Sequence, residues 1–316
     1  MRLLSLIVLC SLWLFAQTPT LSYKASGGVT DMVYDNAKLY VATDASRVDI
    51  FDTTTQTRID TNITVPQIKD FMGDIIDAKI YSIDRVDGAL LMVSQGAKGF
   101  REIYRYNGAM QKLIGIDKKM FISKAMFVNA NTILFALLSN ELFLYDIKAK
   151  KNLWKVAVSH SKFSDFTLNE KRTRAIVADE SGDLKIIDLK SGMISKTLKG
   201  QNLDNVFKVV SKSDKILTAG QDRRAVLYDL NKPHATYYMS TPFLIYASGL
   251  SPSGKLGAYS SDEDNNVVVF DTVSKKKLYK LTSNKMTLSK ILFINENEVF
   301  VSSDSNLLNY YKLQGE

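Results

Sequence analysis

Cysteine and histidine are almost absent from this chain. Its 316 residues include one cysteine, Cys10, and two histidines, His160 and His234. Because Cys10 lies in a segment that we expect to be removed, the mature protein would have no disulfide, catalytic thiol, iron–sulfur cluster or covalently attached haem. Two histidines are too few for a histidine-rich copper or haem site, whose ligands converge in one pocket. No G-x-S-x-G sequence supplies the strained nucleophile turn of a hydrolase either.

Long apolar runs are also missing, apart from one at the N-terminus. Residues 3–16 (LLSLIVLCSLWLFA) form an apolar run of 14 residues after Met1-Arg2. A membrane-spanning helix needs about 20 residues, so this run has the proportions of a signal peptide. We expect cleavage after Ala16, a single domain over residues 17–316, no stable membrane anchor and a periplasmic location. Val8-Leu9 before Cys10 does not fit a lipoprotein signal, which has a small residue directly before the cysteine.

The charge balance is basic, with a formal net charge of +8 and a pI of about 9.2. Export would keep nucleic acid out of reach. The lysines are scattered through turns, as in Lys148, Lys150 and Lys151, and are not gathered in one tract interleaved with aromatic residues. We interpret them as a solvated surface. Attraction to anionic lipid or to an acidic partner is the alternative.

A repeated phrase is the strongest positive signal: an apolar run, an aromatic or aliphatic residue, an aspartate and a polar turn. It occurs as DIFDTTTQT, FLYDIKAKK, KIIDLKSGM, VLYDLNKPH and VVFDTVSKK. By subtraction, Asp146, Asp188, Asp229 and Asp271 lie 42, 41 and 42 residues apart. This period is typical of four-stranded propeller blades. The phrase itself marks the end of each third strand, which makes it a structural feature.

Each repeat unit divides into four predicted strands. In the fifth unit these begin at Val206, Lys215, Ala225 and Ala235. The other units are predicted to start at Val29, near Ile75, at Ile122, Phe163, Ile245 and Leu288, with an insertion around residues 84–87 and Arg105 in the place of the aspartate. The seventh unit lacks a fourth strand. We expect residues 21–26 (LSYKAS) to supply it and to close an all-β, seven-bladed propeller without exposed sheet edges.

The units resemble the WD-repeat family of propellers. TAGQDRRAVLYD, residues 218–229, is the closest match to the third-strand phrase of that family, and Asp222 and Asp264 each precede a strand-end aspartate by seven residues. No unit contains Trp-Asp, and no unit opens with Gly-His. The resemblance therefore concerns the architecture, and propellers host many unrelated functions.

The overall pattern also resembles the NapL family, propeller-like accessory proteins of the periplasmic nitrate reductase system in ε-proteobacteria. The likeness consists of an LWLFAQ-type N-terminus, a cysteine-free Lys/Asn/Ile-rich propeller and aromatic-Asp units without tryptophan. It implies a periplasmic protein with no established catalytic role. We also expect a monomer that uses no cofactor. Such a protein would bind nitrate reductase subunits during assembly, maturation or electron delivery. A cofactor-binding or enzymatic propeller of the quinoprotein or haem type, and a general envelope scaffold, are the alternatives.

One candidate site emerges from aligning the units. The position at the start of the inner strands holds Asp31, Asp77, Lys124, Asp165, Lys208, Ala247 and Lys290. In a propeller these positions crowd the mouth of the central channel, where an unpaired charge is costly. The structural interpretation is that these charges pair with one another and fill the channel mouth. The functional one is a partner-binding channel mouth, extended by Arg223 and Arg224 in a turn on the same side.

Two further motifs concern modification and metal binding. Asn62-Ile63-Thr64 is an N-glycosylation sequon, and Asp60 resembles the extended acceptor of some ε-proteobacterial systems, so Asn62 is a candidate glycosylation site. Asp262, Asp264 and Asn266 alternate as in a calcium loop. Valines stand where that loop needs glycine at its sixth position and glutamate at its twelfth. We therefore predict a polar turn between strands and no metal site.

Overall fold

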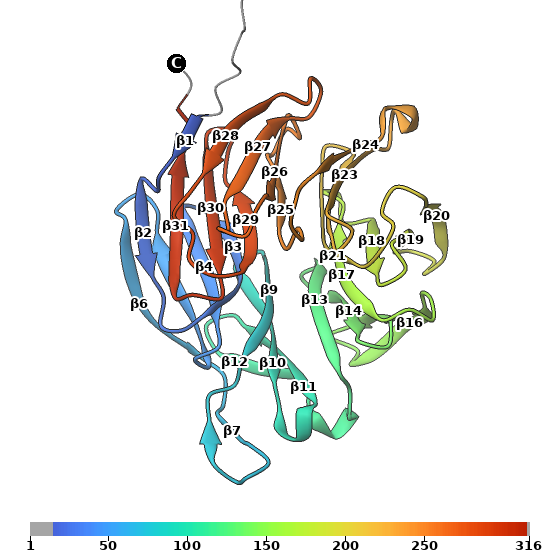
Figure 1. Cartoon of the computed structure of the whole chain (residues 1–316). Coiled ribbons are helices and arrows are strands. Elements are labelled where there is room, and N and C mark those ends of the chain that lie inside the picture. Colours follow the sequence, from blue (N-terminus) through green and yellow to red (C-terminus); the bar gives the residue numbers. More distant parts are fainter. Residues whose placement is uncertain (1–14, 315–316) are drawn as a thin grey trace, which may run out of the picture.

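The computed structural model describes residues 15–314, apart from the side chains of residues 60 and 61. Seven antiparallel sheets follow one another in chain order around a central channel (Figure 1). This confirms the predicted all-β, seven-bladed propeller. Residues 1–14 of the expected signal peptide lie outside the described residues. Phe15–Gln17 forms β1, which pairs in parallel with β28 (Lys277–Leu281).

The first three blades span residues 29–157. Blade 1 contains β3 (Val29–Asp35), β4 (Lys38–Thr43), β5 (Arg47–Asp52) and β6 (Thr57–Thr64). Blade 2 contains β9 (Ile80–Val86), β10 (Ala89–Gln95), β11 (Arg101–Tyr106) and β12 (Met110–Ile114). Blade 3 contains β13 (Ile122–Asn129), β14 (Thr132–Leu137), β15 (Glu141–Asp146) and β16 (Lys151–Ala157). Short 3-10 helices lie at Ala97–Gly99 (η1) and Ile116–Lys118 (η2).

The remaining blades complete the ring. Blade 4 contains β17 (Phe163–Leu168), β18 (Arg174–Asp179), β19 (Leu184–Asp188) and β20 (Ile194–Leu198). Blade 5 contains β21 (Val206–Lys212), β22 (Lys215–Gly220), β23 (Arg224–Asp229) and β24 (Tyr237–Ser240), with η3 (Pro233–Ala235) before the last strand. Blade 6 contains β25 (Ser248–Leu250), β26 (Leu256–Ser260), β27 (Val267–Asp271) and β28. Blade 7 contains β29 (Leu288–Phe293), β30 (Glu298–Ser303) and β31 (Leu307–Lys312), with β2 (Leu21–Lys24) outermost.

The core lies between neighbouring blades. Blades 1 and 2, for example, bury Tyr40, Ile50, Ile80 and Leu90 against one another. The second strand of each blade is covered on both faces, and β10 is buried from Ala89 to Ser94. A strand covered on both faces needs apolar residues without interruption, which explains the continuous runs in the sequence.

The repeated aspartate ends the third strand in five blades. Asp52 accepts hydrogen bonds from the N–H groups of Thr54 and Thr55, both at 2.9 Å, and Asp271 does the same for Val273 and Ser274 at 3.0 and 2.6 Å. A carboxylate in this place stabilises the tight turn that follows it. The predicted structural role of the phrase is confirmed.

The second blade departs from the predicted register. Its inner strand begins at Ile80, and Ile75 belongs to a separate hairpin of β7 (Ile68–Lys69) and β8 (Ile75–Ile76) that projects from the rim (Figure 1). The insertion is this hairpin, because residues 84–87 belong to β9 and its turn. The place of the strand-end aspartate is taken by Asn107, since Tyr106 pairs with Leu90 as Phe51 pairs with Leu39. The apolar pair Ile75-Ile76 in the hairpin has the sequence pattern of a strand start, which explains why the predicted register was wrong.

The two ends of the chain meet in blade 7. β2 pairs antiparallel with β31, from Leu21 opposite Tyr310 to Lys24 opposite Leu307. Tyr23 packs against Phe51 of blade 1 and Phe300 of blade 7, with ring centroids 5.1 and 5.9 Å apart. Within residues 15–314, no helix is long and apolar enough to cross a membrane.

Removing β2 should destabilise the whole ring. A chain that starts at Gly27 loses the β2 pairing and the buried Tyr23, whereas a chain that starts at Thr20 keeps both. We expect the shorter chain to lose about 3 kcal/mol or more of unfolding free energy, the usual cost of deleting a buried aromatic residue, and to associate through its open β31 edge. Urea denaturation and light scattering measure both effects. Equal stability of the two truncated chains would contradict this role.

Candidate functional site: the central channel

The channel is lined by the first strand of every blade. We call the end at which these strands begin the strand-start face, and the opposite end the strand-end face. At the strand-start end, a β-bulge shifts the register between Val29 and Asp31, and the same shift recurs in blades 2, 3, 4, 5 and 7. The residues that follow the bulges occupy equivalent positions and together form one layer of the channel. The equivalent positions in this layer are Asp31, Ser82, Lys124, Asp165, Lys208, Ala247 and Lys290.

Asp77 does not belong to this layer, so that part of the prediction is wrong. Asp77 is exposed at the base of the β7–β8 hairpin, where it accepts a hydrogen bond from Gln67 at 2.9 Å. Ser82 occupies the equivalent position in blade 2. The carboxylate that blade 2 contributes to the channel lining is Asp84, two residues after Ser82.

The carboxylates in the channel serve the backbone of the next blade. Asp31 accepts a hydrogen bond from the N–H of Ile83 at 2.9 Å, and Asp165 accepts one from Val209 at 3.0 Å. Asp84 accepts one from the N–H of Phe127 at 2.8 Å. An inner strand has no neighbouring strand on its channel side, so its N–H groups there need other acceptors. The aspartates supply them and join consecutive blades.

Cations compensate these buried carboxylates. Lys290 pairs with Asp31 at 2.6 Å, and Lys124 pairs with Asp165 at 2.7 Å. Asp84 pairs with Arg172 at 2.7 Å, although Arg172 belongs to the β17–β18 turn on the strand-end face. Four of the six predicted residues are therefore paired with one another, as the structural interpretation of the charged ring expects: Asp31, Lys124, Asp165 and Lys290.

Burial and the neighbouring charges have opposite effects on the pKa values of Asp31 and Lys124. Burial alone would raise the pKa of Asp31, but the charges of Lys290 and Lys124 and the hydrogen bonds from Lys290 and Ile83 outweigh it and lower the pKa. Burial likewise disfavours the charged form of Lys124, but Asp165 and Asp31 raise its pKa. Asp31 and Lys124 are consequently held in their charged forms.

Lys208 differs from the rest of the layer. Within the described residues, its ammonium group has no hydrogen bond or ion pair to another side chain. The layer contains three lysines and two aspartates, which leaves one positive charge uncompensated. Lys208 lines both a channel cavity of about 620 Å³ and a second cavity of about 340 Å³ at the strand-start mouth.

The mouth itself carries aromatic residues that the sequence comparison missed. Each of the six bulges contributes one residue to the mouth, and blade 6 adds Tyr246. The six bulge residues are Thr30, Tyr81, Ser123, Ser164, Phe207 and Ser289. Phe207 and Tyr246 stack with centroids 5.5 Å apart and an interplanar angle of 7°. Arg101 lies 3.6 Å above the ring of Tyr81. The signal would have been the residue just before each position of the layer, since Tyr81, Phe207 and Tyr246 directly precede Ser82, Lys208 and Ala247.

Arg223 lies in the β22–β23 turn and Arg224 is the first residue of β23, so both are on the strand-start face, as predicted by the strand count. Arg223 is exposed. Arg224 points toward the outer strand of its own blade, where it stacks on Tyr238 at 4.2 Å and donates a hydrogen bond to the carbonyl of Gln201 at 2.9 Å. Arg224 is thus engaged within blade 5, and the lining of the channel cavities includes neither arginine.

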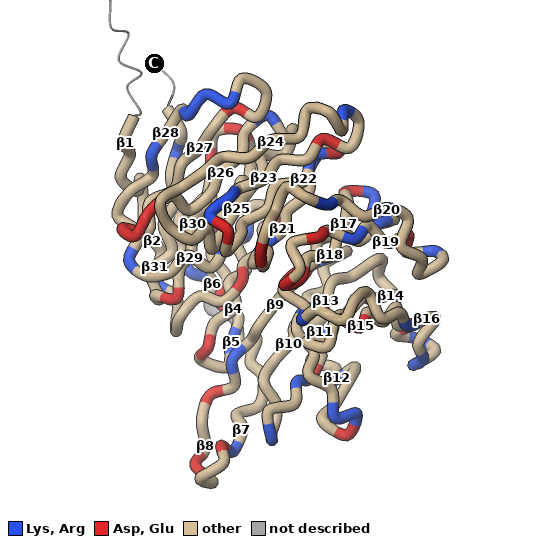
Figure 2. Tube along the Cα trace, turned by 45° about the vertical axis from the view of Figure 1, so that its right-hand side comes forward, with Lys and Arg blue, Asp and Glu red and all other residues tan. Residues whose placement is uncertain are grey.

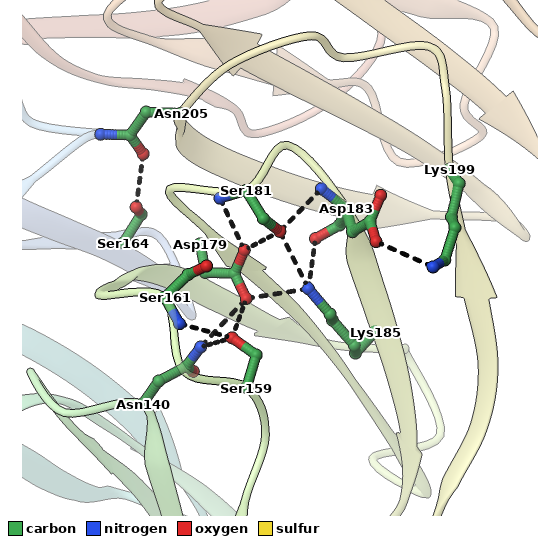
Figure 3. Close-up of polar contacts among 10 residues, drawn as sticks. All are labelled: Asn140, Ser159, Ser161, Ser164, Asp179, Ser181, Asp183, Lys185, Lys199 and Asn205. Atoms are coloured by element: carbon green, nitrogen blue, oxygen red, sulfur yellow. Dashed lines mark hydrogen bonds and ion pairs between the residues drawn. The ribbon is translucent and has the colours of Figure 1, made fainter.

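Another buried ion pair, Lys185 with Asp179 of blade 4, lies at the junction with blade 3 (Figure 3). Asp179 accepts hydrogen bonds from Lys185 at 2.9 Å, Ser159 at 2.8 Å and Asn140 at 3.0 Å. Lys185 also donates to the hydroxyl of Ser181 at 3.0 Å. The hydroxyl of Ser181 in turn donates a hydrogen bond to Asp179, so both residues are engaged with the carboxylate. The network therefore stabilises the junction between the blades.

The other candidate groups are distributed over the surface. His160 and His234 are exposed, and the channel cavities include neither of them nor Trp154. Asp262 receives hydrogen bonds from Asn266 and pairs with Lys280 at 3.1 Å, which makes residues 262–266 a polar turn. Among residues 15–314 there is no group of three or more His, Cys, Asp or Glu placed to hold a metal ion. Lysine and arginine are spread over the turns of many blades (Figure 2).

Six four-stranded sheets and one five-stranded sheet, to which β1 is added, surround a polar channel and define a WD-repeat-like, seven-bladed β-propeller. No protein-family model matches the chain. A 142-residue stretch, 43% of this chain, is 30% identical to the serine-threonine kinase receptor-associated protein of Mus musculus, and the Homo sapiens protein matches to the same extent. The match covers 38% of the length of these relatives. A chain in the crystal structure of the mitotic checkpoint complex superposes with a TM-score of 0.72, covering 95% of this chain and 93% of that chain at 12% identity. This structural likeness establishes the fold.

The Asp31 ion pair should make stability depend on pH in the acid range. Because the folded-state pKa of Asp31 lies below its ordinary value of 3.8, its contribution is complete above that value and is lost as the pH falls through the folded-state pKa. We expect Asp31→Asn to lower the unfolding free energy by about 2 kcal/mol at neutral pH, since Lys290 and the N–H of Ile83 lose a charged partner.

Urea denaturation between about pH 7 and about pH 3 tests this expectation. The gap between the wild type and Asp31→Asn should narrow toward the acid end. Asp304→Asn, an exposed residue at the same mouth, is the control, and its difference from the wild type should stay small throughout. A gap for Asp31→Asn that does not change with pH would refute the proposed coupling.

Proposed function

We propose that this chain is a periplasmic, non-catalytic accessory protein that binds a protein partner through its strand-start face. The observation that carries the proposal is the distribution of exposed apolar side chains. Fourteen large apolar residues are exposed in the described part of the chain. Eight of them lie on the connections between blades: Phe71, Met72, Ile75, Ile76, Ile116, Phe121, Leu203 and Met286.

The topology places all these connections on one face. A blade has four antiparallel strands, an even number, so its outer strand ends on the face where its inner strand began. Every connection to the next blade therefore emerges on the strand-start face. Two exposed apolar residues, Met193 and Val273, lie in turns on the strand-end face, and the other four lie on outer strands or in β1. Soluble proteins rarely concentrate apolar side chains on one face unless that face binds something.

The β7–β8 hairpin is the most prominent part of this face. Phe71 and Met72 at its tip are 96% and 73% exposed. Asp70 orders the tip by accepting hydrogen bonds from the N–H groups of Met72 and Asp74 at 2.8 and 3.0 Å. The exposed pair is thus presented on an ordered turn, which lowers the entropic cost of binding.

The family resemblance and the comparisons support the proposed nature of the partner. The similar proteins are named for association with a receptor kinase and for membership of a multiprotein complex, which supports a protein-binding role. The resemblance to the NapL family supports subunits of the periplasmic nitrate reductase as the partners, with a role in assembly, maturation or electron delivery. Periplasmic location is part of the same proposal and is supported by the apolar run of residues 3–16.

A paired-variant capture experiment tests the docking face. Phe71→Ser/Met72→Ser removes the apolar hairpin tip, and Met193→Ser/Val273→Ser removes a similar exposed pair on the strand-end face. We expect the first variant to recover at least about tenfold less nitrate reductase from periplasmic extract, a loss of about 1.4 kcal/mol, because the tip supplies buried apolar area. The second should bind like the wild type.

Thermal unfolding serves as the control for folding in this experiment. All four side chains are exposed, so both variants should unfold at the temperature of the wild type. If the wild-type protein recovers no component of nitrate respiration, the proposed partner is wrong. If both variants bind equally well, the proposed face is wrong.

Export and glycosylation can be tested together. Asn62 is exposed on β6, the outermost strand of blade 1, where a register shift between Val48 and Ile50 interrupts the pairing. We expect the protein purified from the periplasm of an ε-proteobacterial host to lack residues 1–16 and to carry a glycan that Asn62→Gln abolishes. Intact-mass spectrometry measures both. An unshortened mass would contradict export by this signal, and identical masses of the wild type and Asn62→Gln would contradict glycosylation.

A further inference from the structure

Beyond partner docking, the geometry points to a binding site for a small organic carboxylate at the strand-start mouth of the channel. We propose that Lys208 binds the carboxylate group and that Phe207, Tyr246 and Tyr81 contact an aromatic or apolar part of the ligand. This inference concerns other residues than the apolar connections and does not depend on the proposed protein partner.

The first argument is charge. Asp31, Asp84 and Asp165 each have a cation of their own, in Lys290, Arg172 and Lys124. Lys208 has no such partner among the described side chains, although it lies in the same layer as two of these ion pairs. An ammonium group in a narrow channel is stabilised by an anion. Because the layer is left with a single positive charge, a monoanion matches it better than a dianion does.

The second argument is space beside that charge. Blade 6 adjoins blade 5, and its inner strand presents Ala247 in the layer of Lys208 and Gly249 two residues further along. Ala247 is the smallest side chain of the layer, whereas the space next to Gly249 is filled by Ile291 of blade 7. The channel cavity of about 620 Å³, which Lys208 and Ala247 both line, falls in the range of small-molecule sites.

The third argument is the wall of the mouth. The cavity of about 340 Å³ at the mouth is lined by Tyr81, Phe207 and Tyr246 as well as by Lys208 and Lys79. Phe207 and Tyr246 form a stacked pair, and Lys79 lies 5.8 Å from the ring centre of Tyr81. Flat aromatic walls next to an ammonium group suit a ligand with a carboxylate at one end and a ring or apolar chain at the other.

Calorimetric titration of the full-length mature protein with matched probes tests the proposal. Phenylacetate has both the carboxylate and the ring, phenylacetamide lacks the charge, and acetate lacks the ring. At low ionic strength we expect phenylacetate to bind at least about tenfold more tightly than the other two and than inorganic phosphate. Equal binding of phenylacetamide would refute the ion pair, equal binding of acetate would refute the aromatic contact, and equal binding of phosphate would refute the carboxylate class. Absence of phenylacetate binding would refute the site.

Variants place the site on the structure. Lys208→Met should weaken phenylacetate binding at least about tenfold, whereas Lys196→Met, an exposed lysine on β20, should leave it unchanged. Because Lys208 has no partner to lose among the described residues, Lys208→Met should unfold at or above the wild-type temperature. Unchanged affinity in Lys208→Met would overturn the assignment. The comparison of the four probes uses the unmodified protein, so it decides the ligand class even if a variant is unstable.

Discussion

The central constraint of this structure is that seven inner strands leave backbone N–H groups facing the channel without a neighbouring strand. Asp31, Asp84 and Asp165 accept hydrogen bonds from three of these groups in the next blade. Burying carboxylates for this purpose requires cations beside them, which explains Lys290, Arg172 and Lys124. The charges in the channel are therefore mainly a consequence of closing a ring of open sheet edges.

Hydrogen bonds with buried polar side chains also hold the connections between blades. The buried Asp179 holds Ser159 of the connection between blades 3 and 4, and Asp49 accepts a hydrogen bond from the N–H of Ser26 before blade 1 at 2.6 Å. Asn309 contacts the carbonyl of Ser283 before blade 7 at 3.1 Å. Buried polar side chains thus fix these connections, and the connection before blade 7 also carries the exposed Met286. A rigid face of this kind is suited to binding a protein.

Within the channel, the structure separates residues that stabilise the ring from residues available for binding. Lys124, Asp165, Asp31 and Lys290 are engaged with one another and with backbone groups, whereas Lys208 is available. The repeat alignment placed five of the charged positions in the layer where the structure has them, because the same bulge precedes each of these positions. It could not distinguish engaged from available residues, since that distinction depends on which side chains meet across blades.

The sequence by itself determined the number of blades, the positions of the strand-end aspartates and the shortage of histidine side chains for metal binding or catalysis. These features depend on local repeats and on composition. Only the tertiary structure decided the register of blade 2, where an inserted hairpin with Ile75 and Ile76 imitates a strand, and the aromatic mouth, which depends on β-bulges. The pairing of Asp84 with Arg172, 88 residues apart, likewise has no local signal. Contacts across a closed ring depend on which blades become neighbours and how far each turn reaches, and these are properties of the folded chain.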